Sequence, residues 1–341
     1  MERHKYFMKK CLEIAALGFP NACPNPLVGC IIVYNNEIIG KGYHKKYGEE
    51  HAEVNAINSV KNKKLLTKSI LYVNLEPCSH HGKTPPCTDI IIKHKIPKVV
   101  IGSIDSFKKV CGNGIKTLKN SNIKVIHGIL IEECKFLNKR FFTFHEKKRP
   151  YIILKWAKSQ DNFIAPLKQK GKFWMTSNES KKIVHKWRSE ENAILVGKNT
   201  VLKDDPLLTV RLYNGKNPIR IIINKKSDLS EKFNIFNKQA ETIIYNESQS
   251  KVESNIIYKK IDFNNLLQNL LSDLYSKNIQ SIIVEGGYIT LSGFIKEELW
   301  DEARIFTTKQ ILVKGIKSPK ITQITSNKIK LGDDELNIVY R

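Results

Sequence analysis

Short runs of apolar residues, separated by polar turns, predict a chain in which helices alternate with strands. Residues 5–17 place apolar side chains at helical spacing and stop at Gly18, which predicts a helix. Residues 28–34 form an apolar run, and residues 37–43 return after an Asn-Asn turn, as expected of a β-hairpin. The same pattern continues as helix 52–60, strand 69–75, a helix from about 88, strand 98–102, helix 114–119 and strand 123–127. This alternation predicts a layered α/β domain.

A second domain is predicted after residue 146. Phenylalanines within 141–144 and the basic run 147–149 precede a new apolar strand, so we place the domains at 1–146 and 147–341. The second half then predicts, in order, strand 151–155, helix 177–190, strands 193–196, 219–223 and 242–245, helix 263–276, strand 281–285 and a helix to about 298. Two domains fit the length of 341 residues, since a domain usually takes about 100–200.

Composition places the chain among globular proteins of the cell interior. Hydrophobic residues make up 41% of it, and no run approaches the roughly 18 consecutive apolar residues that cross a bilayer. The N-terminus leads into an amphipathic segment and not into the apolar core of a signal peptide. Seven cysteines, an odd number, do not suggest a disulfide framework. We therefore expect a soluble, cytoplasmic protein that binds no membrane.

The net charge of +24 raises the question of nucleic-acid binding. Only 8 of the 57 basic residues are arginine, the side chain best suited to bidentate phosphate and base contacts. The lysines are also spread along the whole chain among many isoleucines and asparagines. This distribution favours solvated surfaces over a polyanion-binding groove, and we expect no nucleic-acid partner.

Two short motifs carry metal chemistry. His51-Ala52-Glu53 lies where a helix begins, and Cys78 and Cys87 lie at the end of a strand and at the start of the next helix. One imidazole and two thiolates are ligands that suit Zn²⁺ and leave its fourth position for water. Zinc lowers the pKa of such a water to about 7, and Glu53 is placed to move its protons. The order His-x-Glu, then Pro-Cys and Cys, is typical of zinc deaminases.

Two features of this motif leave room for another interpretation. Eight residues separate Cys78 from Cys87, where the usual deaminase signature has two. A purely structural zinc site would need a fourth protein ligand, which His80 or His81 could supply. We favour a catalytic site, with both histidines in a loop that faces the substrate.

In the second half, Val284-Glu285-Gly286-Gly287 joins a buried strand to a helix. Backbone N–H groups at such a helix start can hold a dinucleotide phosphate. The run is not a Gly-x-Gly-x-x-Gly fingerprint, so a plain tight turn is the alternative.

The motifs of the first half resemble the deaminase domain of the bifunctional riboflavin-biosynthesis deaminase/reductases. The resemblance rests on Pro24-Asn25-Pro26, Gly42-x-His44, His51-Ala52-Glu53-Val54 and the run 75–87 with its long insert. It implies a cytidine-deaminase-like three-layer fold and a ribosylated diaminopyrimidinone 5′-phosphate as substrate, contacted by Asn25, His44 and Lys83. The family's Asp-Pro-Asn-Pro run is eroded here to residues 105–114, of which Asp105 and two glycines match.

The second half resembles the reductase domain of the same family, which has a dihydrofolate-reductase-like fold and uses NADPH. The resemblance, which spans about residues 5–310, assigns residues to the cofactor: Ala157, Trp174, Thr200, Asp204 and the segment 287–293, which begins with Gly287. It assigns others to the substrate: Arg188, Leu208, Arg211 and Glu285. Asp204 is the polar residue expected nearest the chemistry. The sequence departs from the family at Asn162, where a glycine is usual, and at Lys172, where a small polar residue is usual.

The combined prediction is an enzyme with two sites. The first hydrolyses an exocyclic amine of 2,5-diamino-6-ribosylamino-4(3H)-pyrimidinone 5′-phosphate with zinc, and the second reduces its ribosyl group to ribityl with NADPH. We also expect a homo-oligomer, either a dimer or a tetramer. One alternative is a nucleic-acid-editing zinc deaminase with a non-catalytic C-terminal domain. Another is a deaminase whose reductase domain has become an inactive scaffold, as Asn162 and Lys172 would allow.

Overall fold

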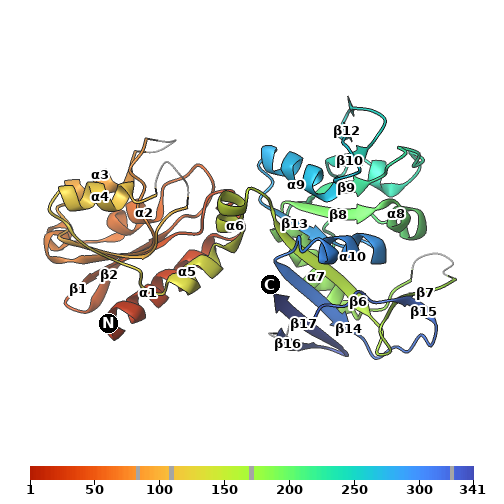
Figure 1. Ribbon diagram of the computed structural model, residues 1–341. Helices are drawn as coiled ribbons and strands as arrows, with labels where there is room; N and C mark the ends of the chain where they lie inside the picture. Colours follow the sequence, from red (N-terminus) through yellow and green to blue (C-terminus); the bar gives the residue numbers. More distant parts are fainter. Residues whose placement is uncertain (82–84, 107–110, 169–172, 323–325) are drawn as a thin grey trace. The chain divides into compact units, whose positions relative to one another are not determined.

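Two units make up the chain, Met1–Lys147 and Lys148–Arg341, and each is described here by itself. The computed structural model describes residues 1–81, 85–106, 111–168, 173–322 and 326–341 (Figure 1). None of the helices in these ranges is both long and apolar enough to cross a membrane.

The N-terminal unit is built on a mixed sheet, whose order within the described residues is β2-β1-β3-β4-β5. Its strands are β1 (Gly29–Tyr34), β2 (Glu37–Tyr43), β3 (Ile70–Leu75), β4 (Lys98–Ser103) and β5 (Lys124–His127). The hairpin β1–β2 is antiparallel and joins β3 through an antiparallel β1–β3 pair, whereas β3, β4 and β5 are parallel. Because β3 and β4 run in parallel, their carboxyl ends meet at one edge of the sheet, which is where the first site forms.

Helices cover both faces of this sheet, as the predicted three-layer fold requires. One apolar layer packs α2 (Ala52–Ser59), α3 (Cys87–Lys93) and α4 (Asn113–Asn120) against the strands. The opposite layer packs α1 (Glu2–Ala15) and α5 (Ile131–Leu137). The segment that we interpreted as a domain boundary forms α6 (Lys139–Lys147), whose phenylalanines are buried.

The C-terminal unit contains a sheet ordered β11-β12-β10-β9-β8-β13-β6-β14-β17-β16 in the described part of the chain. The strands are β6 (Tyr151–Lys158), β8 (Ala193–Gly197), β9 (Ile219–Ile223), β10 (Thr242–Asn246), β11 (Lys251–Glu253), β12 (Ile256–Lys260), β13 (Ser281–Val284), β14 (Glu302–Thr307), β16 (Ser326–Leu331) and β17 (Asp334–Tyr340). The central strands are parallel and isoleucine-rich because both of their faces are buried.

Helices also cover both faces of the second sheet. Helices α7 (Asn178–Glu190) and α8 (Lys198–Asp204) pack on one face, and α9 (Leu266–Ser276) and α10 (Tyr288–Lys296) pack on the other. A separate two-stranded ribbon pairs β7 (Phe163–Pro166) with β15 (Gly315–Lys317). Strand β6 runs three residues past the predicted strand 151–155, and β14 to β17 were not predicted.

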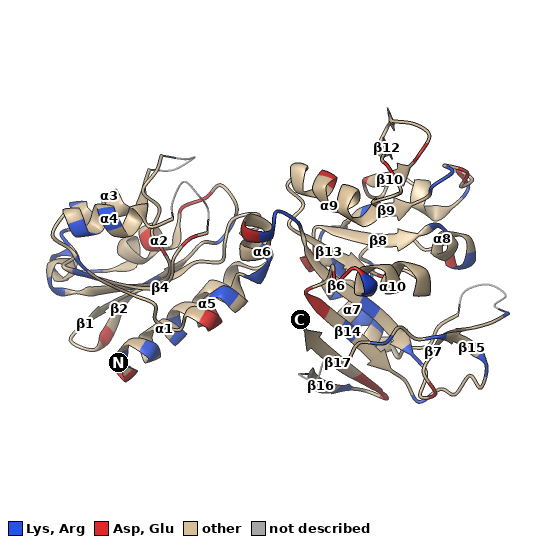
Figure 2. Ribbon diagram, viewed as in Figure 1, with Lys and Arg blue, Asp and Glu red and all other residues tan. Residues whose placement is uncertain are grey.

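Basic residues are distributed widely over this fold. Figure 2 shows lysine and arginine on helices, strands and loops of both units. This spread is what solvated faces would produce.

Candidate active sites

Three side chains from separate elements meet at the carboxyl edge of the first sheet. His51 is the N-cap of α2, Cys78 follows the end of β3, and Cys87 is the first residue of α3. Their ligand atoms all lie within 4.8 Å of one another, and they form the one such group found among the described residues. His80 and His81 are described and are not part of this group.

The distances within this group fit a zinc ion. His51 Nδ1 lies 3.5 Å from Cys78 Sγ and 3.3 Å from Cys87 Sγ. A tetrahedral zinc, about 2.1 Å from nitrogen and 2.3 Å from sulfur, separates two such ligand atoms by roughly 3.6 Å. The three side chains are therefore already spaced as zinc ligands.

Hydrogen bonds favour the thiolate that a metal needs. The Cys87 thiol, together with His51, lowers the pKa of Cys78 to about 4, although burial opposes this, and the same contact with Cys78 raises the pKa of Cys87. The backbone N–H of Cys87, at the start of α3, also donates to Cys78 Sγ at 3.3 Å. The long insert between the cysteines does not separate them, because Thr88 N donates to the carbonyl of Cys78 at 3.1 Å.

Glu53 lies in the first turn of α2, two residues after the His51 ligand, and is only 3% exposed. Burial and the nearby Cys78 thiolate raise the pKa of its carboxyl group. The carboxylate also interacts with Cys87. Glu53 therefore lies beside the three candidate zinc ligands and is not one of them, which is the position that a proton shuttle needs.

Asn25 and His44, two of the predicted substrate residues, lie together beside the candidate zinc ligand His51. Asn25 Nδ2 is 3.1 Å from His44 Nε2, and His44 Nδ1 is 3.1 Å from the carbonyl oxygen of Glu50. Because that carbonyl can only accept, His44 Nδ1 carries the proton and Nε2 accepts from the Asn25 amide. The His44 ring packs edge-on against the His51 ring, with centroids 5.4 Å apart. Lys83, the third predicted contact, is outside the described residues.

Glu76 is a functional candidate that we did not single out from the sequence. It is 4% exposed, and its carboxylate accepts backbone N–H groups from Asp105, Gly112 and Ile115 at 3.3, 2.9 and 3.1 Å. The same segment approaches the backbone next to Cys78 so closely that only glycine fits at residue 114, since a Cβ there would lie 2.1 Å from the Pro77 carbonyl oxygen. Glu76 thus ties both ends of the eroded segment to the strand that presents Cys78. Residues 107–110 of this segment lie outside the described part.

A second site occupies a pocket of about 640 Å³ in the C-terminal unit. Such a volume is ordinary for a cofactor or substrate site. The residues that the sequence assigned singly to the reductase site all line this pocket: Ala157, Trp174, Arg188, Thr200, Asp204, Leu208, Arg211, Glu285 and Gly287. Of the assigned segment 287–293, residues 287–290 line the pocket and 291–293 do not, since Leu291 packs in the core.

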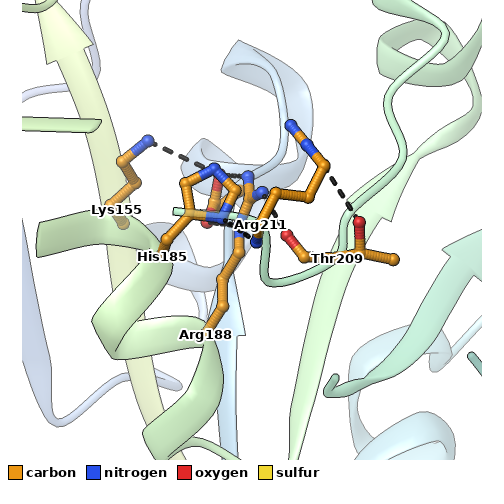
Figure 3. Close-up of polar contacts among 6 residues, drawn as sticks. Lys155, His185, Arg188, Thr209 and Arg211 are labelled. Carbon is orange, nitrogen blue, oxygen red and sulfur yellow. Dashed lines mark hydrogen bonds and ion pairs between the residues drawn. The ribbon is translucent and has the colours of Figure 1, made fainter. Parts of the chain in front are cut away.

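An ion-pair cluster forms one wall of the pocket (Figure 3). Arg188 binds the Glu285 carboxylate through Nε at 3.0 Å and Nη2 at 2.8 Å, and Lys155 Nζ lies 3.5 Å from the same carboxylate. Burial alone would raise the pKa of Glu285, but the charges of Arg188 and Lys155 outweigh it and lower that pKa to about 2. Glu285 is therefore ionised at neutral pH.

Arg211 reaches the same wall from the loop after α8. Its Nη1 donates to Thr209 Oγ1 at 3.0 Å, and its backbone N–H donates to His185 Nδ1 at 3.0 Å (Figure 3). His185 also lines the pocket, yet the sequence gave it no role. It belongs to the helical pattern of α7, and its partner on the loop is 26 residues away.

The predicted cofactor residues line the pocket from other elements. Thr200, on α8, accepts a hydrogen bond from Gly287 N at 3.2 Å, which links α8 to the start of α10. A Cβ on Gly286 would lie 2.7 Å from the Thr290 side chain, so only glycine fits there. Trp174 is 58% exposed, with Lys181 Nζ 4.8 Å from its ring centroid. Asp204 ends α8 and lines the pocket.

The structure accounts for one of the two departures from the reductase family. Asn162 adopts a φ of +66°, in the left-handed region that favours glycine. Asparagine is among the residues that enter this region most readily, so it can replace glycine here. Lys172, the other departure, lies outside the described residues.

Two known families match the chain. Residues 150–323 match the RibD C-terminal domain, and residues 1–103 match the cytidine and deoxycytidylate deaminase zinc-binding region. The riboflavin biosynthesis protein RibD of Aquifex aeolicus is 39% identical over 323 residues, covering 92% of this chain and 89% of the relative. The RibD protein of Escherichia coli is 34% identical over 326 residues, covering 90% and 88%.

Solved structures resemble the chain over its whole length. A diaminohydroxyphosphoribosylaminopyrimidine deaminase/5-amino-6-(5-phosphoribosylamino)uracil reductase of Thermotoga maritima is 36% identical, with a TM-score of 0.86 and 99% of both chains covered. RibD of Acinetobacter baumannii is 28% identical, with a TM-score of 0.88 and coverage of 100% of this chain and 99% of the other.

Proposed function

The chain belongs to the RibD family of bifunctional riboflavin-biosynthesis deaminase/reductases, and we propose that its two sites act on one pyrimidine ribosyl phosphate. The substrate of the first site is 2,5-diamino-6-ribosylamino-4(3H)-pyrimidinone 5′-phosphate. The first unit removes an amine from its ring, and the second converts its ribosyl group to ribityl. We assign the first reaction to residues 1–146 and the second to residues 147–341.

In the first reaction, water adds to the ring carbon that bears the amine, the C–N bond breaks, and ammonia leaves as a ring carbonyl forms. Zinc held by His51, Cys78 and Cys87 would supply the nucleophile, because it lowers the pKa of a bound water to about 7. Glu53 would take a proton from this water and deliver it to the departing nitrogen. This half of the proposal rests on the grouping of His51, Cys78 and Cys87 with the buried Glu53 beside them.

Asn25 and His44 would orient the pyrimidine at this site. Their mutual hydrogen bond and the contact of His44 with Glu50 fix the orientation of the His44 ring, which packs edge-on against His51. Lys83, in the loop between the two cysteines, would approach the substrate phosphate, since a cation there suits a phosphate monoester.

In the second reaction, the C1′–O4′ bond of the ribosyl group breaks, a hydride adds to C1′ and a proton reaches O4′. NADPH bound against Ala157, Trp174, Thr200, Asp204 and Gly287 would supply the hydride. Asp204 would be the polar group nearest the reacting carbon. Leu208, which also lines the pocket, would pack against the substrate.

The charges of the pocket favour a phosphorylated substrate. Basic side chains outnumber acidic ones in its lining: Lys155, Lys181, Arg188, Lys198, Lys203 and Arg211 against Asp204 and Glu285. A phosphate monoester is close to a dianion at neutral pH, and arginine pairs with two of its oxygens at once. We therefore propose that Arg188 and Arg211 bind the 5′-phosphate, and that Glu285 holds Arg188 in place.

Removal of the metal separates the two activities. Treatment with a zinc chelator is expected to abolish ammonia release and to leave NADPH oxidation on the already deaminated substrate unchanged, because the metal ligands all belong to the first unit. Added zinc should restore ammonia release. Steady ammonia release from protein shown to be metal-free would contradict the proposed mechanism.

A further inference from the structure

Two side chains of α7 hold the loop that carries Arg211. His185 and Arg188 are three residues apart, so they lie on the same face of the helix. His185 Nδ1 accepts the backbone N–H of Arg211 at 3.0 Å, and Arg188 Nη1 donates to the Thr209 carbonyl at 3.3 Å. Figure 3 shows both side chains pointing from the helix toward this loop. The loop backbone is thus held on both sides of residue 210.

This loop needs such support. Residues 206–217 form no helix or strand, and Leu208 adopts a φ of +54°, in the left-handed region that is unfavourable for a residue with a branched side chain. Arg211 itself is exposed, so packing does not fix its backbone. The hydrogen bond to His185 restrains the Arg211 backbone directly, beside the bond from the neighbouring Val210 N–H to Asn217 Oδ1 at 2.8 Å.

His185 is suited to this task because its ring is neutral. Burial, together with the charges of Arg188, Arg211 and Lys155, lowers the pKa of His185 to about 4, although Glu285 acts in the opposite direction. A neutral ring that accepts at Nδ1 carries its proton on Nε2. The acceptor is therefore present throughout the neutral pH range.

We propose that His185 is a positioning residue of the reductase site, which sets Arg211 against the phosphate of the substrate by accepting its backbone N–H. This inference rests on the proposed function, in which Arg211 binds that phosphate. It predicts that the geometry of the acceptor, and not the bulk of the ring, is what the site requires.

Two matched variants separate these requirements. Asparagine places its side-chain oxygen near the position of Nδ1, whereas glutamine places it near Nε2. The H185Q variant is expected to raise the KM for the deaminated substrate about tenfold, as for the loss of one hydrogen bond. The KM for NADPH, the kcat of the reductase and ammonia release should change little. The H185N variant should bring the substrate KM back toward that of the unmodified enzyme.

A second background tests whether His185 acts through Arg211. In an Arg211→Met enzyme, which has a raised KM of its own, adding H185Q should have almost no further effect. An equal KM change in both backgrounds, or equal KM values for H185N and H185Q, would overturn the positioning role. Absence of NADPH oxidation by the unmodified enzyme would instead overturn the proposed function, and this inference with it.

Discussion

Replacing Glu53 by glutamine is expected to lower the rate of ammonia release by about 10²–10⁴-fold while zinc stays bound. Glutamine keeps the size of the buried side chain but cannot take up or return a proton. The ligands His51, Cys78 and Cys87 are unchanged, so zinc content should remain at that of the unmodified protein. Ammonia release and metal content, measured on the same preparation, test this expectation.

A matched control is available on the surface of the same unit. Glu37 is exposed at the start of β2, and Glu37→Gln makes the same chemical change away from the candidate zinc ligands. It should leave ammonia release unaltered. If the Glu53→Gln enzyme retained its zinc and released ammonia within a few-fold of the unmodified rate, Glu53 could not be the proton shuttle.

Replacing Arg188 by methionine is expected to produce the largest effect in the second unit. It would remove both hydrogen bonds to the Glu285 carboxylate and leave that buried group with Lys155 alone, 3.5 Å away. Removing one partner from a buried ion pair costs about 3–5 kcal/mol. The side chains of Arg188 and Glu285 are only 12% and 9% exposed, so water offers little compensation. Denaturant unfolding and NADPH oxidation would measure the two consequences.

A double variant distinguishes stability from substrate binding. Arg188→Met combined with Glu285→Gln removes the stranded charge and should recover much of the lost stability. It should not recover reductase activity, because the proposed phosphate ligand is still missing. Full stability of the single variant would mean that Glu285 does not depend on Arg188, contrary to the cluster that we describe.

The metal site was predictable because its residues carry their chemistry in short motifs. Neither His-x-Glu nor Pro-Cys identifies a ligand alone, but their order, with a strand before Cys78 and a helix after His51, indicates a zinc site at a sheet edge. The long insert between Cys78 and Cys87 weakened the motif on spacing alone. Its ends are close in space because Cys87 begins a helix whose backbone bonds to Cys78.

Residues that work through distant partners could not be predicted in this way. Glu76 accepts N–H groups that lie 29 to 39 residues further along the chain, and nothing in its local sequence indicates them. His185 likewise occupies an ordinary position on a helix. Its role depends on a loop that only the tertiary structure brings to it.

The C-terminal strands β16 and β17 were missed although their sequence carries a local signal. Asp334 is a buried acid at the start of β17. The structure satisfies its carboxylate with Ser177 N at 2.8 Å and Ser180 Oγ at 2.6 Å, at the start of α7. Strand β17 then pairs with β14, an element that we did not predict either. The alternation in Lys328-Ile329-Lys330-Leu331 and Leu336-Asn337-Ile338, joined by Gly332-Asp333-Asp334, is the pattern of a β-hairpin and could have indicated both strands.

The central claim is that one chain carries out both reactions, and one incubation tests it directly. Purified, zinc-loaded protein would be mixed with the diaminopyrimidinone ribosyl 5′-phosphate and NADPH, and ammonia and NADPH would be followed together. We predict that ammonia and oxidised cofactor appear in equal final amounts and that the product carries a ribityl chain. Ammonia without NADPH oxidation would contradict a working second site, and neither signal from folded protein would contradict the proposed substrate.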